Sequence, residues 1–139
     1  GATAKIVFGE VHATTKALLT SGKPELVAIG QKLGAALKAW TDATEWLAAN
    51  AKTGLGGVLT AAVPYLHLAV TVTGGWMMGK AALAASGYLD KGEGDLPFYR
   101  AKVATARFYA DQLLPQAAAY AETVKAGDAA LAGTDELFL

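Results

Sequence analysis

The chain has 139 residues, the size of one ordinary domain, and it can bury an apolar core without disulfide bonds. Its 12 basic and 12 acidic residues cancel, which argues against nucleic acid or an anionic membrane surface as a partner. It contains no cysteine, which excludes disulfides and thiolate metal sites and suits a reducing compartment. We therefore expect one cytoplasmic domain over residues 1–139. The N-terminus has no signal-peptide pattern, and because the chain lacks an initiating Met we expect it to be a fragment of a longer gene product.

The first predicted helix covers residues 5–19. It places Val7, Val11 and Leu18 on one apolar stripe. Alanine, a strong helix former, is abundant along the whole chain, and no segment alternates in the manner of a half-buried strand. The sequence therefore predicts an all-α fold.

The second predicted helix covers residues 24–51 and begins at Pro24, which suits a first helical turn because its missing N–H is not needed there. Lys38 and Asp42 lie one turn apart on its polar side. The other side carries apolar residues at steps of three and four: Leu26, Ile29, Leu33, Ala36, Trp40, Ala43 and Leu47. This pattern predicts an amphipathic helix with one buried face.

Residues 53–79 contain no Asp, Glu, Lys or Arg. The glycines at 54–57 predict a break, and the helix predicted after it continues to about residue 88. Apolar residues fall on two opposite lines of it: Val63, Leu66, Val70 and Met77 on one, Tyr65, Leu68, Val72 and Trp76 on the other. A helix that is apolar all round is stable only inside other apolar structure, so we expect a fully buried central helix. Its Trp76 is expected to lie against Tyr99 and Val103 of the last helix. Pro64 predicts a kink or a start. Gly74-Gly75 predicts a loosened turn, and two residues this small would also let another helix cross closely there.

A membrane-spanning helix is the alternative for this stretch, since its uncharged length passes the usual threshold. The stretch also contains Pro64, His67 and several glycines and threonines, and its neighbours are amphipathic with ordinary charged faces. These features favour a buried bundle helix over a membrane span.

The last long helix is predicted over residues 96–125, with Asp95 as its N-cap and a bend at Pro115. Its apolar positions step by four and three: Tyr99, Val103, Ala106, Ala110, Leu113, Ala117, Tyr120 and Val124. This spacing predicts an antiparallel up-and-down four-helix bundle with crossing angles of roughly 20°. A short tail follows over residues 128–139, and its apolar end is expected to dock on another surface.

No catalytic, cofactor-binding or metal-ligating set is predicted within the chain. His12 and His67 each lack the Glu three residues earlier that a di-iron bundle needs, and haem ligation by His67 with Met77 or Met78 is a less favoured alternative to simple packing. The glycines at 54–57 lack the Lys-Ser or Lys-Thr of a phosphate loop. Residues 90–95 have glycines where a calcium loop needs ligands.

Several segments resemble the C-terminal domain of long-form acyl-CoA dehydrogenases, a group that includes 3-methylmercaptopropionyl-CoA dehydrogenases. They are residues 62–68 (AVPYLHL), 74–77 (GGWM), 81–85 (AALAA), 98–110 (FYRAKVATARFYA) and 113–115 (LLP). In that family a helical domain follows a dehydrogenase core, and the core carries FAD and the carboxylate that removes the α-proton of the acyl thioester. The resemblance implies a non-catalytic domain of a homo-oligomeric enzyme, with FAD and the catalytic base before residue 1.

The candidate contact residues toward that core or a neighbouring subunit are Tyr65, His67, Arg100 and Arg107. For each of them, packing within the domain is the competing interpretation. Val7 and Phe138 are further candidates, because they are apolar residues near the two chain ends. The resemblance favours a domain that supports assembly or shields the substrate end, and a free-standing helical interaction or adaptor protein is the alternative.

Overall fold

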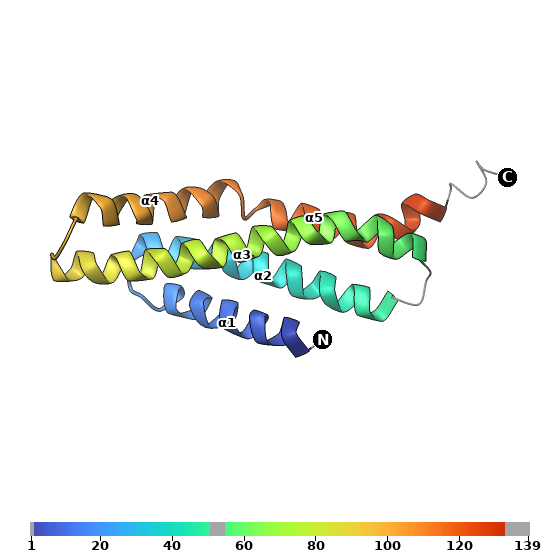
Figure 1. Ribbon diagram of the computed structural model, residues 1–139, viewed down its shortest axis with the longest axis horizontal. Helices are drawn as coiled ribbons and strands as arrows, with labels where there is room; N and C mark the ends of the chain where they lie inside the picture. Colours follow the sequence, from blue (N-terminus) through green and yellow to red (C-terminus); the bar gives the residue numbers. More distant parts are fainter. Residues whose placement is uncertain (1, 51–54, 133–139) are drawn as a thin grey trace.

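The structure is a computed structural model that describes the backbone of residues 2–50 and 55–132 and the side chains of residues 2–50 and 59–127. Figure 1 shows its helices: α1 (Ala2–Leu19), α2 (Pro24–Asn50), α3 (Leu55–Lys91), α4 (Leu96–Gln112) and α5 (Gln116–Ala132). Strands are absent from these residues, so the all-α prediction is confirmed for the described chain.

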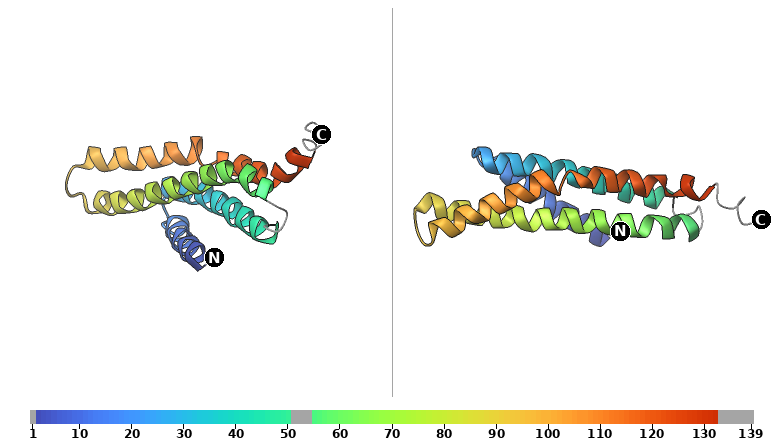
Figure 2. Two further views of the ribbon diagram at one scale, coloured as in Figure 1. Left: turned by 45° about the vertical axis from the view of Figure 1, so that its right-hand side comes forward. Right: turned by 90° about the horizontal axis from the view of Figure 1, so that it is seen from above.

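The longest helix, α3, contacts each of the other helices. Helices α4 and α5 follow one another along one side of α3, and the chain reverses direction between α2 and α3 and again between α3 and α4 (Figure 1). Helix α1 diverges from the others toward its N-terminus (Figure 2). The antiparallel up-and-down four-helix arrangement stays a prediction.

The apolar stripe predicted for the second helix forms the centre of the core. Six of its seven residues are buried, namely Leu26, Ile29, Leu33, Ala36, Trp40 and Ala43, and Leu47 is partly buried against them. Val11 and Leu18 of α1 are also buried, while Val7 of the same stripe is half-buried. Apolar burial of this kind is the main favourable term in folding, so α2 anchors the domain.

The predicted last helix is divided into α4 and α5. Pro115 has no N–H to donate, and the backbone N–H groups of Leu113 and Leu114 both donate to the carbonyl of Tyr109, at 2.9 and 3.2 Å. The helix therefore ends and restarts where only a bend was predicted. Across this break Leu114 becomes buried and Leu113 is exposed, the reverse of the predicted stripe. The predicted N-cap is confirmed, since the Phe98 N–H donates to Asp95 Oδ1 at 3.1 Å.

The prediction that α3 is buried on all sides is wrong. Leu68 and Val72 are fully buried, but the opposite line, made of Val63, Leu66, Val70 and Met77, is exposed. The helix begins at Leu55, within the predicted break at residues 54–57, and runs unbroken through Pro64, so the predicted break and the predicted start are both wrong. Within the part of the chain that the structure describes, the neighbouring helices cover only one side of α3, and the other apolar side is exposed.

Small residues on the covered side of α3 permit this close packing. A Cβ atom at Gly74 would lie 2.2 Å from Oη of Tyr109, and one at Gly75 would lie 2.6 Å from Cδ2 of Leu114. Separations this short are not possible between real atoms without movement. Glycine at both positions therefore lets α4 and its junction with α5 approach the backbone of α3.

Candidate functional site

The most distinctive surface of the molecule is the exposed line along α3. We call it the outer α3 face and define it as Leu59, Val63, Leu66, Val70 and Met77. These side chains are 44–64% exposed, although all five are large and apolar. Their steps of four, three, four and seven residues keep them on one side of the helix.

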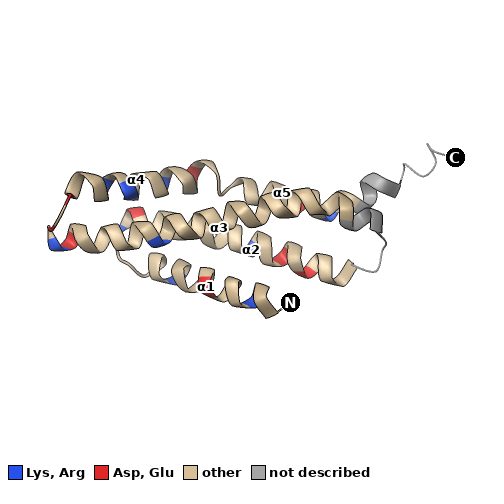
Figure 3. Ribbon diagram, in the orientation of Figure 1, with Lys and Arg blue, Asp and Glu red and all other residues tan. Residues whose placement is uncertain are grey.

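No charged residue interrupts the outer α3 face. Figure 3 shows that charged residues on the described part of α3 are confined to its C-terminal portion. In the sequence the first of them is Lys80, three residues beyond Met77. A continuous apolar line without charge is unusual on a surface helix, which normally shows polar residues to water.

At its C-terminal end, the outer α3 face runs into a hollow of about 240 Å³ between α3 and α4. The hollow is lined by Met77, Met78, Ala81, Phe98, Ala101, Lys102 and Thr105. The Phe98 ring is exposed, and Lys102 Nζ lies 5.2 Å from its centroid, within cation–π range. Apolar surface thus continues from α3 onto α4.

Two of the predicted contact residues have partners inside the domain. The Tyr65 hydroxyl accepts a hydrogen bond from Trp40 Nε1 at 3.2 Å and lies 2.8 Å from Thr44 Oγ1. Arg107 donates from Nε to Asp111 at 2.9 Å and from Nη1 to Glu25 of α2 at 3.1 Å.

These contacts give Tyr65 and Arg107 structural roles between helices. The hydrogen bond from Arg107 to Asp111 also raises the pKa of Arg107 above its ordinary value. A further role for either residue in contact with a core stays a prediction.

The other predicted contact residues are dispersed. His67 is exposed on α3 and stacks on Tyr120 of α5, with ring centroids 5.3 Å apart. Arg100 is exposed on α4, and Val7 is half-buried on α1 against the core. Phe138 lies outside the described residues. The structure therefore does not gather the described candidates into one site.

Sequence reasoning missed the outer α3 face as a surface. Four of its members were assigned to a buried line, and Leu59 was not singled out at all. The signal was present, because seven-residue spacing without any charge is the pattern of a helix that contacts another helix. Because this stretch has no charged residue on any side, the sequence could not show which apolar side faces the domain's own core.

The Trp76 side chain also lies elsewhere than expected. It was predicted to be buried against Tyr99 and Val103 of the last helix. Instead it is half-buried, and its Nε1 donates to Thr14 Oγ1 of α1 at 3.0 Å, while Lys80 Nζ lies 5.1 Å from its ring. Tyr99 stacks on Tyr88 near the other end of the domain, with centroids 4.7 Å apart. Trp76 therefore ties α3 to α1 and not to α4.

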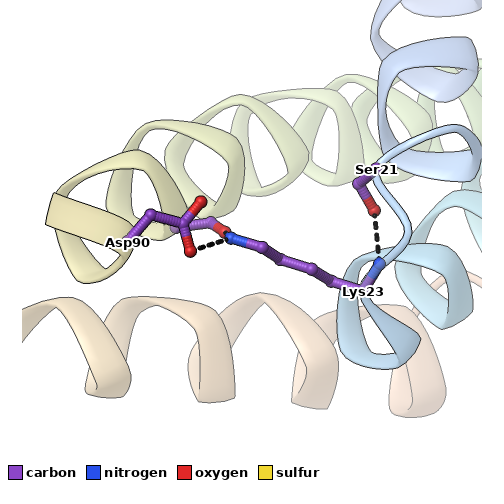
Figure 4. Close-up of polar contacts among 4 residues, drawn as sticks. Ser21, Lys23 and Asp90 are labelled. Carbon is purple, nitrogen blue, oxygen red and sulfur yellow. Dashed lines mark hydrogen bonds and ion pairs between the residues drawn. The ribbon is translucent and has the colours of Figure 1, made fainter.

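A polar cluster joins the α1–α2 turn to the end of α3. Lys23 donates from its ammonium group to the carboxylate of Asp90 and to the hydroxyl of Ser86, and its backbone N–H donates to Ser21 Oγ at 3.2 Å (Figure 4). All the groups in this cluster are engaged with one another. The arrangement links chain segments that are distant in sequence, and nothing in it resembles an acid–base pair facing a substrate.

A wide groove lies between α1 and α2. It measures about 590 Å³ and is lined mainly by apolar groups, with Phe8 and Leu37 among them. Its one ammonium group, on Lys38, is paired with Asp42 at 2.7 Å. A flavin pyrophosphate needs convergent N–H donors or free cations, so this groove does not fit FAD.

Within the described residues, no group of three or more His, Cys, Asp or Glu side chains could hold a metal ion. The same part of the chain has no helix with the length and hydropathy needed to cross a membrane.

Comparison with known proteins gives two matches. The family model described as acetyl-CoA dehydrogenase C-terminal like matches residues 7–135. A 3-methylmercaptopropionyl-CoA dehydrogenase from Ruegeria pomeroyi is 34% identical over 125 residues, which are 89% of this chain and 21% of that protein. The chain therefore spans about a fifth of the length of this curated relative. Both matches confirm the resemblance predicted from the sequence motifs.

Proposed function

The chain belongs to the acetyl-CoA dehydrogenase C-terminal-like family, and on this premise we propose that it is a non-catalytic helical domain of an FAD-dependent acyl-CoA dehydrogenase. The observation that carries the proposal is the unequal coverage of the match. Almost the whole chain aligns with a dehydrogenase, yet it accounts for only 21% of that enzyme. The flavin and the base that removes the α-proton then belong to the remaining part of the polypeptide.

In this proposal the helical domain supports assembly of the enzyme or shields the substrate end of its active site. The full-length protein is a cytoplasmic homo-oligomer that oxidises fatty acyl-CoA or methylmercaptopropionyl-CoA. Helices α2, α3 and the α4–α5 pair, with α1 beside them, pack as an antiparallel up-and-down bundle over residues 1–139. Bound to the core, FAD would accept the hydride from the acyl thioester, and this chain would contribute only structure.

Several contacts support a structural role. The Lys23–Asp90 ion pair joins the α1–α2 turn to α3, and the Arg107–Glu25 ion pair joins α4 to α2. The carboxylates in these pairs accept hydrogen bonds from cations at the surface. A general base in an acyl-CoA dehydrogenase must instead face the substrate in a site that excludes water.

The test uses the gene product that carries this chain and the chain alone. The complete protein should purify with flavin and reduce an electron-acceptor dye with an acyl-CoA substrate. The chain alone, mixed with FAD and passed through a desalting column, should retain no flavin and show no turnover. Stoichiometric flavin retention by the isolated chain would refute the proposal that it is non-catalytic.

A second candidate function is a free-standing helical interaction or adaptor protein. The exposed outer α3 face favours it, because such a surface can bind a helix of another protein. The two functions differ in one result: a flavin-free gene product without acyl-CoA turnover would favour the adaptor.

A further inference from the structure

We infer that the outer α3 face is the surface on which the dehydrogenase core of the same polypeptide docks, and that the core presents an uncharged apolar helix there. This inference rests on the proposed function, because it requires an enzyme core joined to this domain. It assigns the contact to Leu59, Val63, Leu66, Val70 and Met77.

The spacing of the outer α3 face selects a helix as the partner. From Leu59 to Met77 the face extends about 27 Å along α3, at about 1.5 Å per residue. Its steps of four, three, four and seven residues follow a heptad seam, with Thr73 at the position between Val70 and Met77, and such a seam packs along a second helix crossing at roughly 20°. The occupant is therefore a helix of several turns.

The absence of charge selects the chemistry of that helix. The described part of α3 carries no charged side chain before Lys80, so none could neutralise a buried ion on the partner. Burying an unpaired charge costs several kcal/mol, whereas apolar groups gain about 25 cal/mol for each Å² removed from water. Leu, Ile, Val, Met or Ala at the contacting positions fits these limits.

The size of the face distinguishes a tethered core from a second copy of the chain. With 44–64% of each side chain exposed, the five residues offer roughly 500 Å² of apolar surface, similar to the largest patches of single proteins. A stable interface between free proteins buries about 800 Å² on each partner. The five side chains alone fall short of that area, and a partner on the same chain has an effective concentration near the millimolar range and needs less of it.

The comparison supplies such a tethered partner. The matched segment is 21% of the Ruegeria pomeroyi relative, so nearly four-fifths of an enzyme of that length lies outside this domain. Docking through the outer α3 face would cover the apolar line that this chain by itself leaves exposed.

The experiment places a photoreactive amino acid at Leu66, the middle of the face, in the complete gene product. A matched probe at Gln31, exposed on α2, serves as the control. The inference expects a cross-link from position 66 to a helix of the core within the same polypeptide, and only background yield from position 31. Mass spectrometry of the cross-linked peptides identifies the occupant, and circular dichroism checks that both labelled proteins are folded.

Two results would overturn the inference: a cross-link from position 66 to α3 of a second copy, or background yield from position 66 in a folded protein. Flavin content and turnover, measured on the same samples, separate this inference from the proposed function. An active flavoenzyme without the position 66 cross-link leaves the proposed function standing and removes the docking face. A flavin-free protein that still gives the cross-link to a core helix keeps the docking face and removes the proposed function.

Discussion

Replacing Gly74 with alanine tests whether the close approach of α4 to α3 positions the domain's helices. In an open helix, alanine is more favourable than glycine by about 1 kcal/mol. At Gly74, however, the new Cβ would lie 2.2 Å from Oη of Tyr109, a residue whose hydroxyl donates to the Thr71 carbonyl at 2.8 Å. The ring must move, at a packing cost of about 1 to 3 kcal/mol. Loss of the hydrogen bond adds about 0.5 to 1.5 kcal/mol.

The net expectation is that Gly74→Ala destabilises the chain by about 1 to 3 kcal/mol. Gly87→Ala is the matched control, since it lies in the same helix and a Cβ there meets nothing within 4 Å. It should stabilise the chain by up to about 1 kcal/mol. Denaturant midpoints of both variants, with unchanged slopes, measure the difference.

A double-mutant cycle identifies the atom responsible. In a Tyr109→Phe background the Oη atom is gone, so Gly74→Ala should cost at least about 1 kcal/mol less than it does in the parent. Equal stability of the Gly74→Ala and Gly87→Ala variants, or an additive cycle, would refute the packing argument and show that α4 adjusts freely.

Three further predictions concern other parts of the chain. Trp76→Ala should cost about 2 to 3 kcal/mol, below the value for a fully buried Trp because the ring is half-buried, whereas Lys38→Ala should stay within about 0.5 kcal/mol in the same denaturation assay. Burial raises the pKa of Tyr109 above 10.0, so the folded state keeps this proton to a higher pH than the unfolded chain does. The free energy of unfolding should therefore fall as the pH rises above about 10, and Tyr109→Phe should make this fall with pH less steep. Self-association of the isolated chain through its ends, measured by light scattering, should weaken with Val7→Asp and with Phe138→Asp, and a parent that is monomeric at high concentration would contradict it.

The second helix could be predicted closely because its sequence places charged residues on one side and apolar residues on the other. Charged residues such as Lys38 and Asp42 mark the side that faces water, so the buried line through Leu33 and Trp40 follows from periodicity alone. The structure confirms both the helix and its buried face.

The central helix lacks that contrast, and periodicity could not orient it. Leu66 and Leu68 are chemically identical and two residues apart, yet one is exposed and the other is fully buried. The choice is made by tertiary packing, because Gly74 and Gly75 admit the α4–α5 junction on one side only. Sequence reasoning identified these glycines as a possible crossing point but could not say which side of the helix the crossing would cover.

The candidate contact residues show a similar limit. Tyr65 and Arg107 were selected for their chemical type, and their partners Trp40 and Glu25 belong to a helix distant in sequence. Pro115 was correctly identified as a perturbation, but periodicity did not show that Leu114, and not Leu113, would be buried at the break. Such outcomes depend on the packed state and not on local pattern.

The two sides of α3 carry different constraints, and this difference supports a docking role for the outer side. On the inner side, glycine at positions 74 and 75 lowers helix propensity by up to about 1 kcal/mol per residue, but it permits close packing. On the outer side, Leu66 and Val70 expose apolar area that contributes nothing to the stability of this domain. Polar residues there would suit an isolated helix better, since they would lower the risk of association. The outer α3 face raises the risk of association in the isolated domain, but it would be covered if the rest of a larger enzyme docks there. The cross-link from position 66 is therefore the decisive measurement.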